Sequence, residues 1–185
     1  MEAPFCGLRL LVEPGKVMTP RPATEALVET AVERVAGRAA LVADVGTGSG
    51  AVAVAIASRA PQARIWATDT SASAVRLARA NVCRHGLGDR VSIVRGDLLD
   101  GSPAGLDLVV ANLPYLAAGL RTERPELAGE PPEAVFAAGD GLDPYRRLVQ
   151  ACASALRPDG YLAIQLHGQV VGRHASELSG LTLAA

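Results

Sequence analysis

The sequence predicts an α/β fold in which a mainly parallel sheet carries helices on both faces. Short apolar runs that suit buried strands alternate with amphipathic stretches of helical period along most of the chain. Such alternation is typical of parallel sheets. A glycine-rich turn joins the first of these strands to the next helix. In sheets of this kind a ligand binds beyond the carboxyl ends of the strands, where the strand order reverses.

The elements are expected in a regular order. Residues 1–23 are predicted to form a β-hairpin and an extended segment, because the apolar run 8–12 is followed by a Pro14-Gly15 turn and by residues 16–18. Residues 24–185 are predicted to form the main domain. Its strands are expected at 41–45, 64–68, 91–95, 107–111 and 161–166, and its helices at 24–36, 50–59, 71–85 and 142–156. A Pro158-Asp159-Gly160 turn is expected to close the last helix. The stretch 117–141 is long for a connection and is a candidate lid or substrate-docking loop.

Composition is that of an ordinary globular protein, with 49% hydrophobic and 20% charged residues in a chain of 185. A net charge of -1 gives no electrostatic footprint for a phosphate backbone, which argues against tight, sequence-independent nucleic-acid binding but leaves a local basic patch open. Three widely spaced cysteines, Cys6, Cys83 and Cys152, predict reduced thiols and no metal site. The start of the sequence has no signal-peptide pattern, and no apolar run approaches roughly 18 residues. We therefore expect a cytoplasmic protein without membrane contact.

Small and acidic residues follow three successive predicted strands. The first of these loops contains Gly46, Thr47, Gly48, Ser49 and Gly50, and its glycines let the backbone approach a ligand closely. Asp69 ends the second strand, where a carboxylate can accept both hydroxyls of a ribose. Asp97 and Leu98 follow the third strand, where they suit the amine and the ring face of an adenine. Each feature alone fits a tight turn or a helix cap. Together they predict an S-adenosylmethionine site.

The fourth predicted strand is followed directly by Asn112-Leu113-Pro114-Tyr115. This segment can hold a planar NH2 group by both hydrogens, since the Asn112 side-chain oxygen accepts one and the Leu113 main-chain carbonyl the other. Pro114 fixes the turn, and Tyr115 offers a flat wall for stacking. All four residues are catalytic candidates, and Asn112 also borders the expected donor site. Beside an electrophilic methyl donor, the segment predicts an N-methyltransferase.

These residues give the sequence a family likeness: it resembles the protein-(glutamine-N5) methyltransferases that modify peptide-chain release factors. Further matching runs are Pro20 to Glu25, Glu130-Pro131, Gly139 to Leu142 and Tyr145-Arg146. The resemblance implies a Rossmann-like class I methyltransferase that uses S-adenosylmethionine. It also implies a substrate, the glutamine side-chain amide in the Gly-Gly-Gln loop of a release factor. We expect catalysis by positioning and electrostatic help, with no metal and no general base of perturbed pKa.

The chain departs from the family pattern in several places. Leu113 stands where the family has proline, Ala23 where it has glutamate, and Gln165 where an acidic residue is usual. The carbonyl acceptor survives at position 113, but the backbone there is less rigid. The family's N-terminal helical domain is expected to be absent, and the chain is expected to stop before the last strand pair of the fold.

Other functions remain open on these residues. A nucleic-acid methyltransferase acting on adenine N6 or a guanine amine would use the Asn-x-Pro-Tyr segment on a flipped base, although the near-neutral charge argues against it. A non-catalytic S-adenosylmethionine-binding module is compatible with Leu113 and the missing terminal segments. Gly46-x-Gly48-x-x-Ala51 also fits the looser fingerprint of a dehydrogenase, but that function leaves residues 112–115 without a task.

Overall fold

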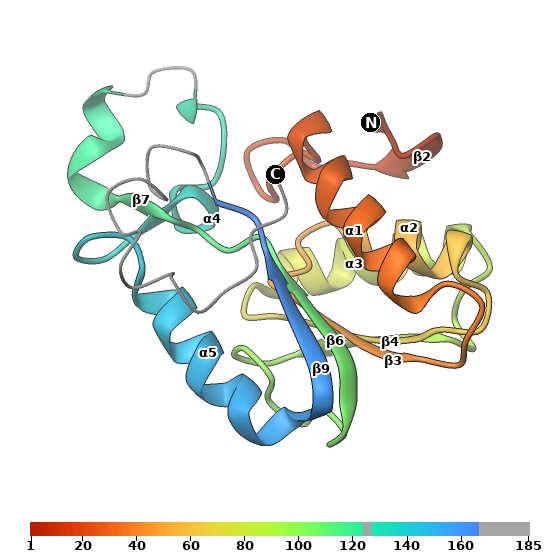
Figure 1. Cartoon of the computed structure of the whole chain (residues 1–185). Coiled ribbons are helices and arrows are strands. Elements are labelled where there is room, and N and C mark those ends of the chain that lie inside the picture. Colours follow the sequence, from red (N-terminus) through yellow and green to blue (C-terminus); the bar gives the residue numbers. More distant parts are fainter. Residues whose placement is uncertain (124–126, 167–185) are drawn as a thin grey trace.

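The computed structural model describes residues 1–123 and 127–166. At its centre lies a five-stranded sheet in the order β5-β4-β3-β6-β9, and every neighbouring pair is parallel (Figure 1). The strands are β3 (Leu41–Val45), β4 (Arg64–Asp69), β5 (Val91–Arg95), β6 (Leu106–Ala111) and β9 (Leu156–Ile164). The chain adds β4 and β5 on one side of β3, and then β6 and β9 on the other. The strand order therefore reverses between β3 and β6, and the predicted parallel sheet is confirmed.

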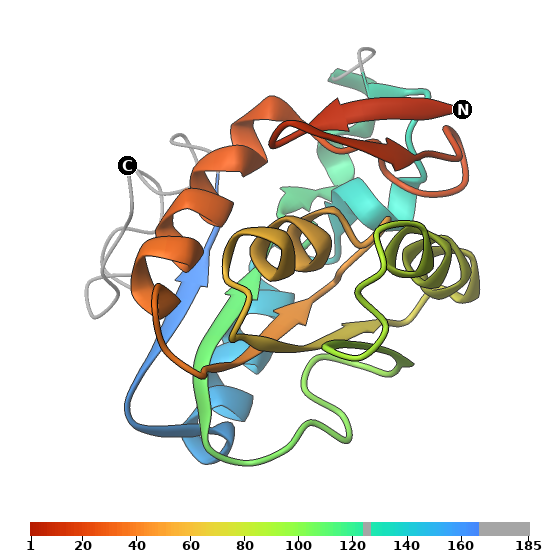
Figure 2. The same cartoon turned by 90° about the vertical axis from the view of Figure 1, so that its right-hand side faces the viewer.

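Helices cover both faces of the sheet, but unequally. α1 (Glu25–Val35), α2 (Ala51–Arg59) and α3 (Ala72–Arg84) lie on one face, and α5 (Asp143–Ala155) lies on the other (Figures 1 and 2). Successive strand residues alternate between the two layers: Val42 packs with the three helices, whereas Ala43 and Val45 pack with α5. The Ala- and Val-rich α2 is buried from Ala51 to Ala57 because it lies against the sheet and between its two helical neighbours.

The N-terminal hairpin is built from different segments than expected. β1 (Glu2–Phe5) pairs antiparallel with β2 (Leu8–Leu11) around a Cys6-Gly7 turn in which φ is 48° and 75°. Two positive φ values are typical of the type I′ turn, which suits the twist of a hairpin. Phe5 and Leu10 are buried and attach the hairpin to the helical layer. The prediction that residues 16–18 take part was wrong, since Lys16 lies in a turn, Val17 in a bend and Met18 in irregular chain.

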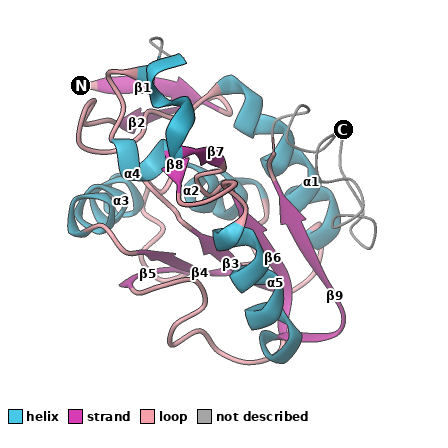
Figure 3. Cartoon of the chain, turned by 90° about the vertical axis from the view of Figure 1, so that its left-hand side faces the viewer, coloured by secondary structure: helices cyan, strands magenta, loops and turns pink. Residues whose placement is uncertain are grey.

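The segment after β6 contains short elements of its own. β7 (Leu116–Ala117), the 3-10 helix η2 (Ala118–Glu123), α4 (Pro132–Val135) and β8 (Phe136–Ala137) follow in order. β7 pairs in parallel with β8, and the two lie beyond the carboxyl end of β6 (Figure 3). The predicted loop at 117–141 is therefore largely structured within the described residues. A 3-10 turn, η1 (Pro22–Thr24), leads into α1.

β9 differs most from the prediction. It begins at Leu156, so the expected Pro158-Asp159-Gly160 turn lies inside the strand, where its register against β6 shifts between Leu106 and Leu108. Asp159 has a φ of 64°, and a Cβ on Gly160 would lie 2.9 Å from the Leu106 carbonyl oxygen. These are the properties of a β-bulge that needs glycine beside the neighbouring strand. The other predicted helices and strands of the main domain agree within one or two residues, the usual scatter of such boundaries.

Several expectations concern the chain as a whole. The expectation that the chain stops before the last strand pair concerns residues after Leu166, which lie outside the described residues. Within residues 1–123 and 127–166, no helix has the length and apolar character needed to cross a membrane. In the same ranges, no group of three or more His, Cys, Asp or Glu side chains suits a metal ion. The cysteines are free thiols, as predicted.

Candidate active site

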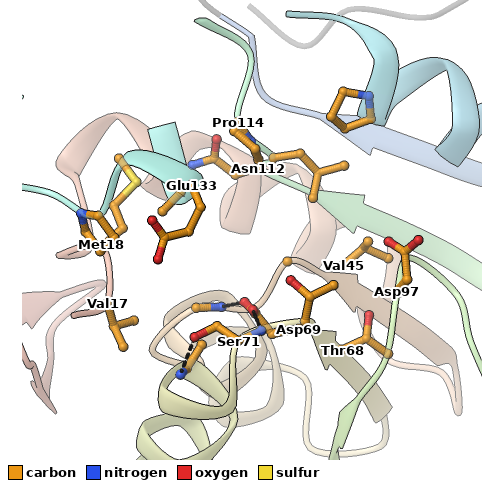
Figure 4. A pocket seen from close by; sticks show the side chains of 18 of the residues that line it. Val17, Met18, Val45, Thr68, Asp69, Ser71, Asp97, Asn112, Pro114 and Glu133 are labelled. Atoms are coloured by element: carbon orange, nitrogen blue, oxygen red, sulfur yellow. Dashed lines mark hydrogen bonds between the residues drawn. The ribbon is translucent and has the colours of Figure 1, made fainter. Parts of the chain in front are cut away.

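The ends of four neighbouring strands surround one cavity of about 250 Å³. Gly46 follows β3, Asp69 ends β4, Asp97 follows β5 and Asn112 follows β6, and all four line the cavity. Figure 4 shows Asn112 across the cavity from Asp69, with Met18 and Asp97 at opposite ends. The site therefore lies at the carboxyl edge of the sheet, where the strand order reverses, which is the usual ligand position in such folds.

Glycine 46 allows the glycine loop to touch the segment after β6. Its φ is 72°, and a Cβ at this position would lie 2.6 Å from Cδ2 of Leu113. Any other residue would therefore displace the Leu113 side chain and strain the backbone of the loop. Gly48, with a φ of 57°, also lines the 250 Å³ cavity.

The other residues predicted in this loop do not line that cavity. Thr47 and Ser49 are buried and border a smaller space of about 70 Å³ on the side of Arg21. Gly50 lines neither space, and a Cβ there would lie 3.1 Å from Cα of Ala78, so this glycine permits close packing of α3. A role for these three residues in donor binding stays a prediction.

Asp44, near the end of β3, holds the glycine loop in place, and it was not predicted as a functional residue. Its carboxylate is buried and accepts hydrogen bonds from the Thr47 hydroxyl at 2.6 Å and from the Ala53 N–H at 3.1 Å. Burial raises the pKa of Asp44 to about 6, and the two hydrogen bonds oppose that shift. The carboxylate thereby ties the end of β3 to the first turn of α2.

Asp69 joins the glycine loop to the start of α3. One carboxylate oxygen accepts from the Gly48 N–H at 2.9 Å, and the other accepts from the Ser71 N–H at 2.8 Å. The N-cap of α3 is Ser71, whose hydroxyl accepts from Ala74, so Asp69 is not itself the cap. Burial raises the pKa of Asp69. Each of its oxygens keeps a further lone pair for a ligand hydroxyl.

Asp97 and Leu98 form the opposite end of the cavity. The Asp97 carboxylate pairs with the guanidinium of Arg147 on α5, and both side chains are about half exposed. Leu98 has a φ of 48°, a conformation that branched and bulky side chains rarely adopt. Its carbonyl accepts from the Thr68 hydroxyl at 2.5 Å, which holds this unusual backbone in place. Sequence reasoning could not reveal Arg147, because it lies fifty positions away on another element.

The amide of Asn112 is oriented by a neighbouring hydroxyl. Its Nδ2 donates to Oγ1 of Thr24 over 3.1 Å. Thr24 is buried at the start of α1. Among the described residues, its Oδ1 accepts no hydrogen bond. The acceptor end of the amide is therefore free for a ligand. Thr24 belongs to the Pro20-to-Glu25 run of the family resemblance, so a signal for it was present in the sequence.

The peptide groups of Leu113 are bound by Tyr145. The Leu113 N–H donates to the Tyr145 hydroxyl at 2.9 Å, and that hydroxyl also lies 2.9 Å from the Leu113 carbonyl oxygen. Pro114 lines the cavity, but Tyr115 does not. Instead, the Tyr115 backbone packs on Gly141, where a Cβ would lie 2.3 Å from the Tyr115 carbonyl oxygen. Stacking by Tyr115 thus stays a prediction.

Two glutamates of the segment after β7 have different surroundings, and only Glu133 lines the cavity. Glu130 accepts from Arg21 at 2.7 Å and from the Thr19 N–H at 3.2 Å, so it joins this segment to the extended N-terminal chain. The Glu133 side chain points into the cavity between Met18 and Asn112 (Figure 4). No pattern in the sequence indicated Glu133.

Comparison with known proteins agrees with this geometry. A family model described as "Methyltransferase small domain" matches residues 20–125. The chain belongs to the methyltransferase small domain family. The "Release factor glutamine methyltransferase" of Geobacter sulfurreducens is 42% identical over 167 residues, which cover 88% of this chain and 57% of that relative. The protein of the same description from Deinococcus radiodurans is 40% identical over 179 residues, covering 96% of this chain and 63% of its own length. The resemblance drawn from the motifs is therefore confirmed.

Solved structures of methyltransferases share the fold of this family member. A ribosomal protein L11 methylase from Lactobacillus delbrueckii subsp. bulgaricus matches with a TM-score of 0.64 at 21% identity, covering 89% of this chain and 70% of its own. The hMettl16 catalytic domain, in complex with the MAT2A 3'UTR hairpin 6, matches with a TM-score of 0.72 at 17% identity, covering 90% and 64%. Identities this low show the fold alone, and they confirm the predicted Rossmann-like fold of class I methyltransferases.

Proposed function

We propose that the protein transfers a methyl group from S-adenosylmethionine to the side-chain amide nitrogen of a glutamine in another protein. Its substrate would be the Gly-Gly-Gln loop of a peptide-chain release factor, in keeping with the description of its relatives, of which this chain spans 57% and 63%. The observation that carries the proposal is the orientation of Asn112. Its NH2 group is held by Thr24, which leaves the oxygen as an acceptor at a cavity shared with the glycine loop and Asp69.

The chemistry of the cavity fits the methyl donor. Gly46 and Gly48 line the cavity without side chains, so a ligand can approach their backbone closely. Asp69 presents two oxygens with spare lone pairs for ribose hydroxyls, and Asp97 with Leu98 would contact the adenine. When bound, the donor supplies an electrophilic methyl group on a sulfonium.

The substrate amide would be held through both of its hydrogens. An amide nitrogen is a weak nucleophile because its lone pair is delocalised into the carbonyl. The Asn112 oxygen and the Leu113 carbonyl would each accept one N–H and so orient that nitrogen toward the donor. Both acceptors carry partial negative charge, which stabilises the positive charge that develops on the nitrogen during transfer. Thr24 contributes by fixing which end of the Asn112 amide faces the substrate.

Methyl transfer to a purified release factor tests the proposal. The protein is incubated with isotopically labelled S-adenosylmethionine and a release factor, and mass spectrometry of the digest locates the label. We expect one methyl group on the glutamine of the Gly-Gly-Gln loop, and none on a release factor with asparagine at that position. Asn112→Ala should lower the rate by about 100-fold or more, because one transition-state partner is lost. Its affinity for the donor, measured by calorimetry, should stay within about threefold, and a joint loss of both would contradict the role of Asn112.

The same assay distinguishes the two alternatives. Label in an adenine- or guanine-containing oligonucleotide, and none in the release factor, would indicate a nucleic-acid methyltransferase. Against that function, the net charge of -1 gives no electrostatic footprint for a phosphate backbone. Donor binding without transfer to either substrate would indicate a non-catalytic binding module.

A further inference from the structure

The hydroxyl of Tyr145 lies among three main-chain groups at the edge of the site. It accepts a hydrogen bond from the Leu113 N–H at 2.9 Å. Its oxygen lies 2.9 Å from the carbonyl oxygen of Leu113 and equally 2.9 Å from that of Gln165, just beyond β9. The tyrosine is 3% exposed, so it is shielded from water. Its pKa is raised by burial, which keeps the hydroxyl protonated.

A single proton cannot serve two carbonyl acceptors at full strength. A phenolic hydroxyl has one O–H donor, whereas two carbonyl oxygens lie within reach at equal distance. Rotation of the O–H bond about the C–O bond exchanges the two hydrogen bonds without moving any heavy atom. In one orientation the Leu113 carbonyl is already engaged by Tyr145. In the other, Gln165 takes the proton and the Leu113 carbonyl keeps both lone pairs.

We propose that Tyr145 is a positioning residue that holds the Leu113 peptide groups and turns its proton from Leu113 to Gln165 when a substrate amide arrives. The inference rests on the proposed function, in which the Leu113 carbonyl accepts one N–H of the substrate. Exchange of a hydrogen-bond donor at this carbonyl keeps the carbonyl satisfied both before and after substrate binding. No covalent bond changes, and the proton stays on the tyrosine throughout.

The leucine at position 113 makes Tyr145 particularly important in this chain. A proline there, as in the family pattern, has no N–H to satisfy. Leu113 is 8% exposed, so its N–H needs a partner inside the protein, and Tyr145 is the acceptor that the structure provides. Tyr145 therefore supplies by hydrogen bonding part of the fixation that a proline ring would supply covalently. Loss of the Tyr145 hydroxyl should consequently lower kcat and the thermal midpoint more in the wild type than in Leu113→Pro.

A double-mutant cycle of Tyr145→Phe and Leu113→Pro tests this inference. The readouts are kcat and KM for the release factor, donor affinity by calorimetry, and the thermal midpoint of all four proteins. With leucine at 113, Tyr145→Phe should lower kcat by about 10- to 100-fold, as small misplacements of catalytic groups do. KM and donor affinity should change by less than about threefold. With proline at 113, the same substitution should lower kcat by less than about threefold, and it should lower the thermal midpoint less as well.

Tyr161→Phe is the matched control. Tyr161 is exposed, lies beside Leu108 in the sheet and stacks with Arg34, so kcat of Tyr161→Phe should equal that of the wild type. Equal losses of kcat from Tyr145→Phe in both backgrounds, or a kcat unchanged with leucine at 113, would overturn the inference. A loss of donor affinity in step with kcat would overturn it too, because it would indicate general damage to the site. Both proposals fail if the wild type transfers no methyl group to the release factor and Tyr145→Phe lowers the thermal midpoint equally with leucine and with proline at position 113. If transfer is absent but the midpoint losses differ as expected, the proposed function fails while Tyr145 still satisfies the Leu113 N–H.

Discussion

Asp44→Asn should change the way in which the stability of the protein depends on pH. Asp44 is 2% exposed, and burial raises its pKa from 3.8 to about 6. The folded protein therefore holds this proton more tightly than the unfolded chain does. The resulting contribution to the free energy of unfolding is complete below about pH 4 and is lost as the pH rises through about 6. At about 1.4 kcal/mol for each pH unit between these values, the loss amounts to about 3 kcal/mol.

Urea unfolding of the wild type and of Asp44→Asn between about pH 4 and pH 7 measures this loss. The variant has no titrating group at position 44, so the difference between the two free energies of unfolding isolates Asp44. We expect the wild type to lose about 3 kcal/mol relative to the variant across this range, and the difference to stay level at higher pH. A difference that is constant within about 0.5 kcal/mol, or one that rises with pH, would refute a buried carboxyl of raised pKa.

Three further substitutions probe the geometry of the site. Thr24→Val removes the hydroxyl that fixes the Asn112 amide, so kcat should fall by about 5-fold, which corresponds to one hydrogen bond of about 1 kcal/mol. Thr24→Ser keeps the hydroxyl and should retain the rate. Equal rates in Thr24→Val and Thr24→Ser would contradict the role of Thr24 in orienting Asn112. In urea unfolding, Gly46→Ala should destabilise the protein by at least about 1 kcal/mol more than Gly37→Ala. Both glycines have positive φ, but only a side chain at position 46 would clash with another side chain. Equal losses of unfolding free energy in the two variants would show that no close contact exists. Glu130→Gln should lower stability by about 1 kcal/mol, a value kept small by the exposure of its partner arginine, and salt should weaken this effect; a cost independent of salt would contradict an ion pair.

Most of the sheet and its helices could be predicted because their patterns are local. The mainly apolar runs that became β3, β5 and β6 are short, and α3 follows Ser71, whose side chain caps the helix. The hairpin strands were misplaced because the turn uses Cys6-Gly7 in place of the common Asn-Gly pair. The start of β9 was misplaced because Pro158 to Gly160 has the composition of a turn, while pairing with β6 decides its conformation.

The site was predictable only as far as strand ends and motifs determine it. The positions of Asp69, Asp97 and Asn112 followed from the rule that ligands gather at the carboxyl ends of parallel strands. Their hydrogen-bond partners did not follow, because contacts such as those of Tyr145 and Arg147 arise from how α5 packs on the sheet. Sequence patterns report which residues share an element, and they carry little information about which side chains meet across two elements.

The pairing of β7 with β8 has a consequence for how this protein can vary. Leu116 lies beside Phe136 and Ala117 beside Ala137, so the two ends of the segment between β7 and β8 are held together by strand pairing. Gly141 adds a second contact between these two ends, because its backbone lies directly against that of Tyr115. Insertions or deletions within residues 118–123 would therefore leave residues 112–115 in register, because the pairing of β7 with β8 fixes both ends of the segment. Changes of length in this segment can therefore accumulate without disturbing the part of the site that residues 112–115 form.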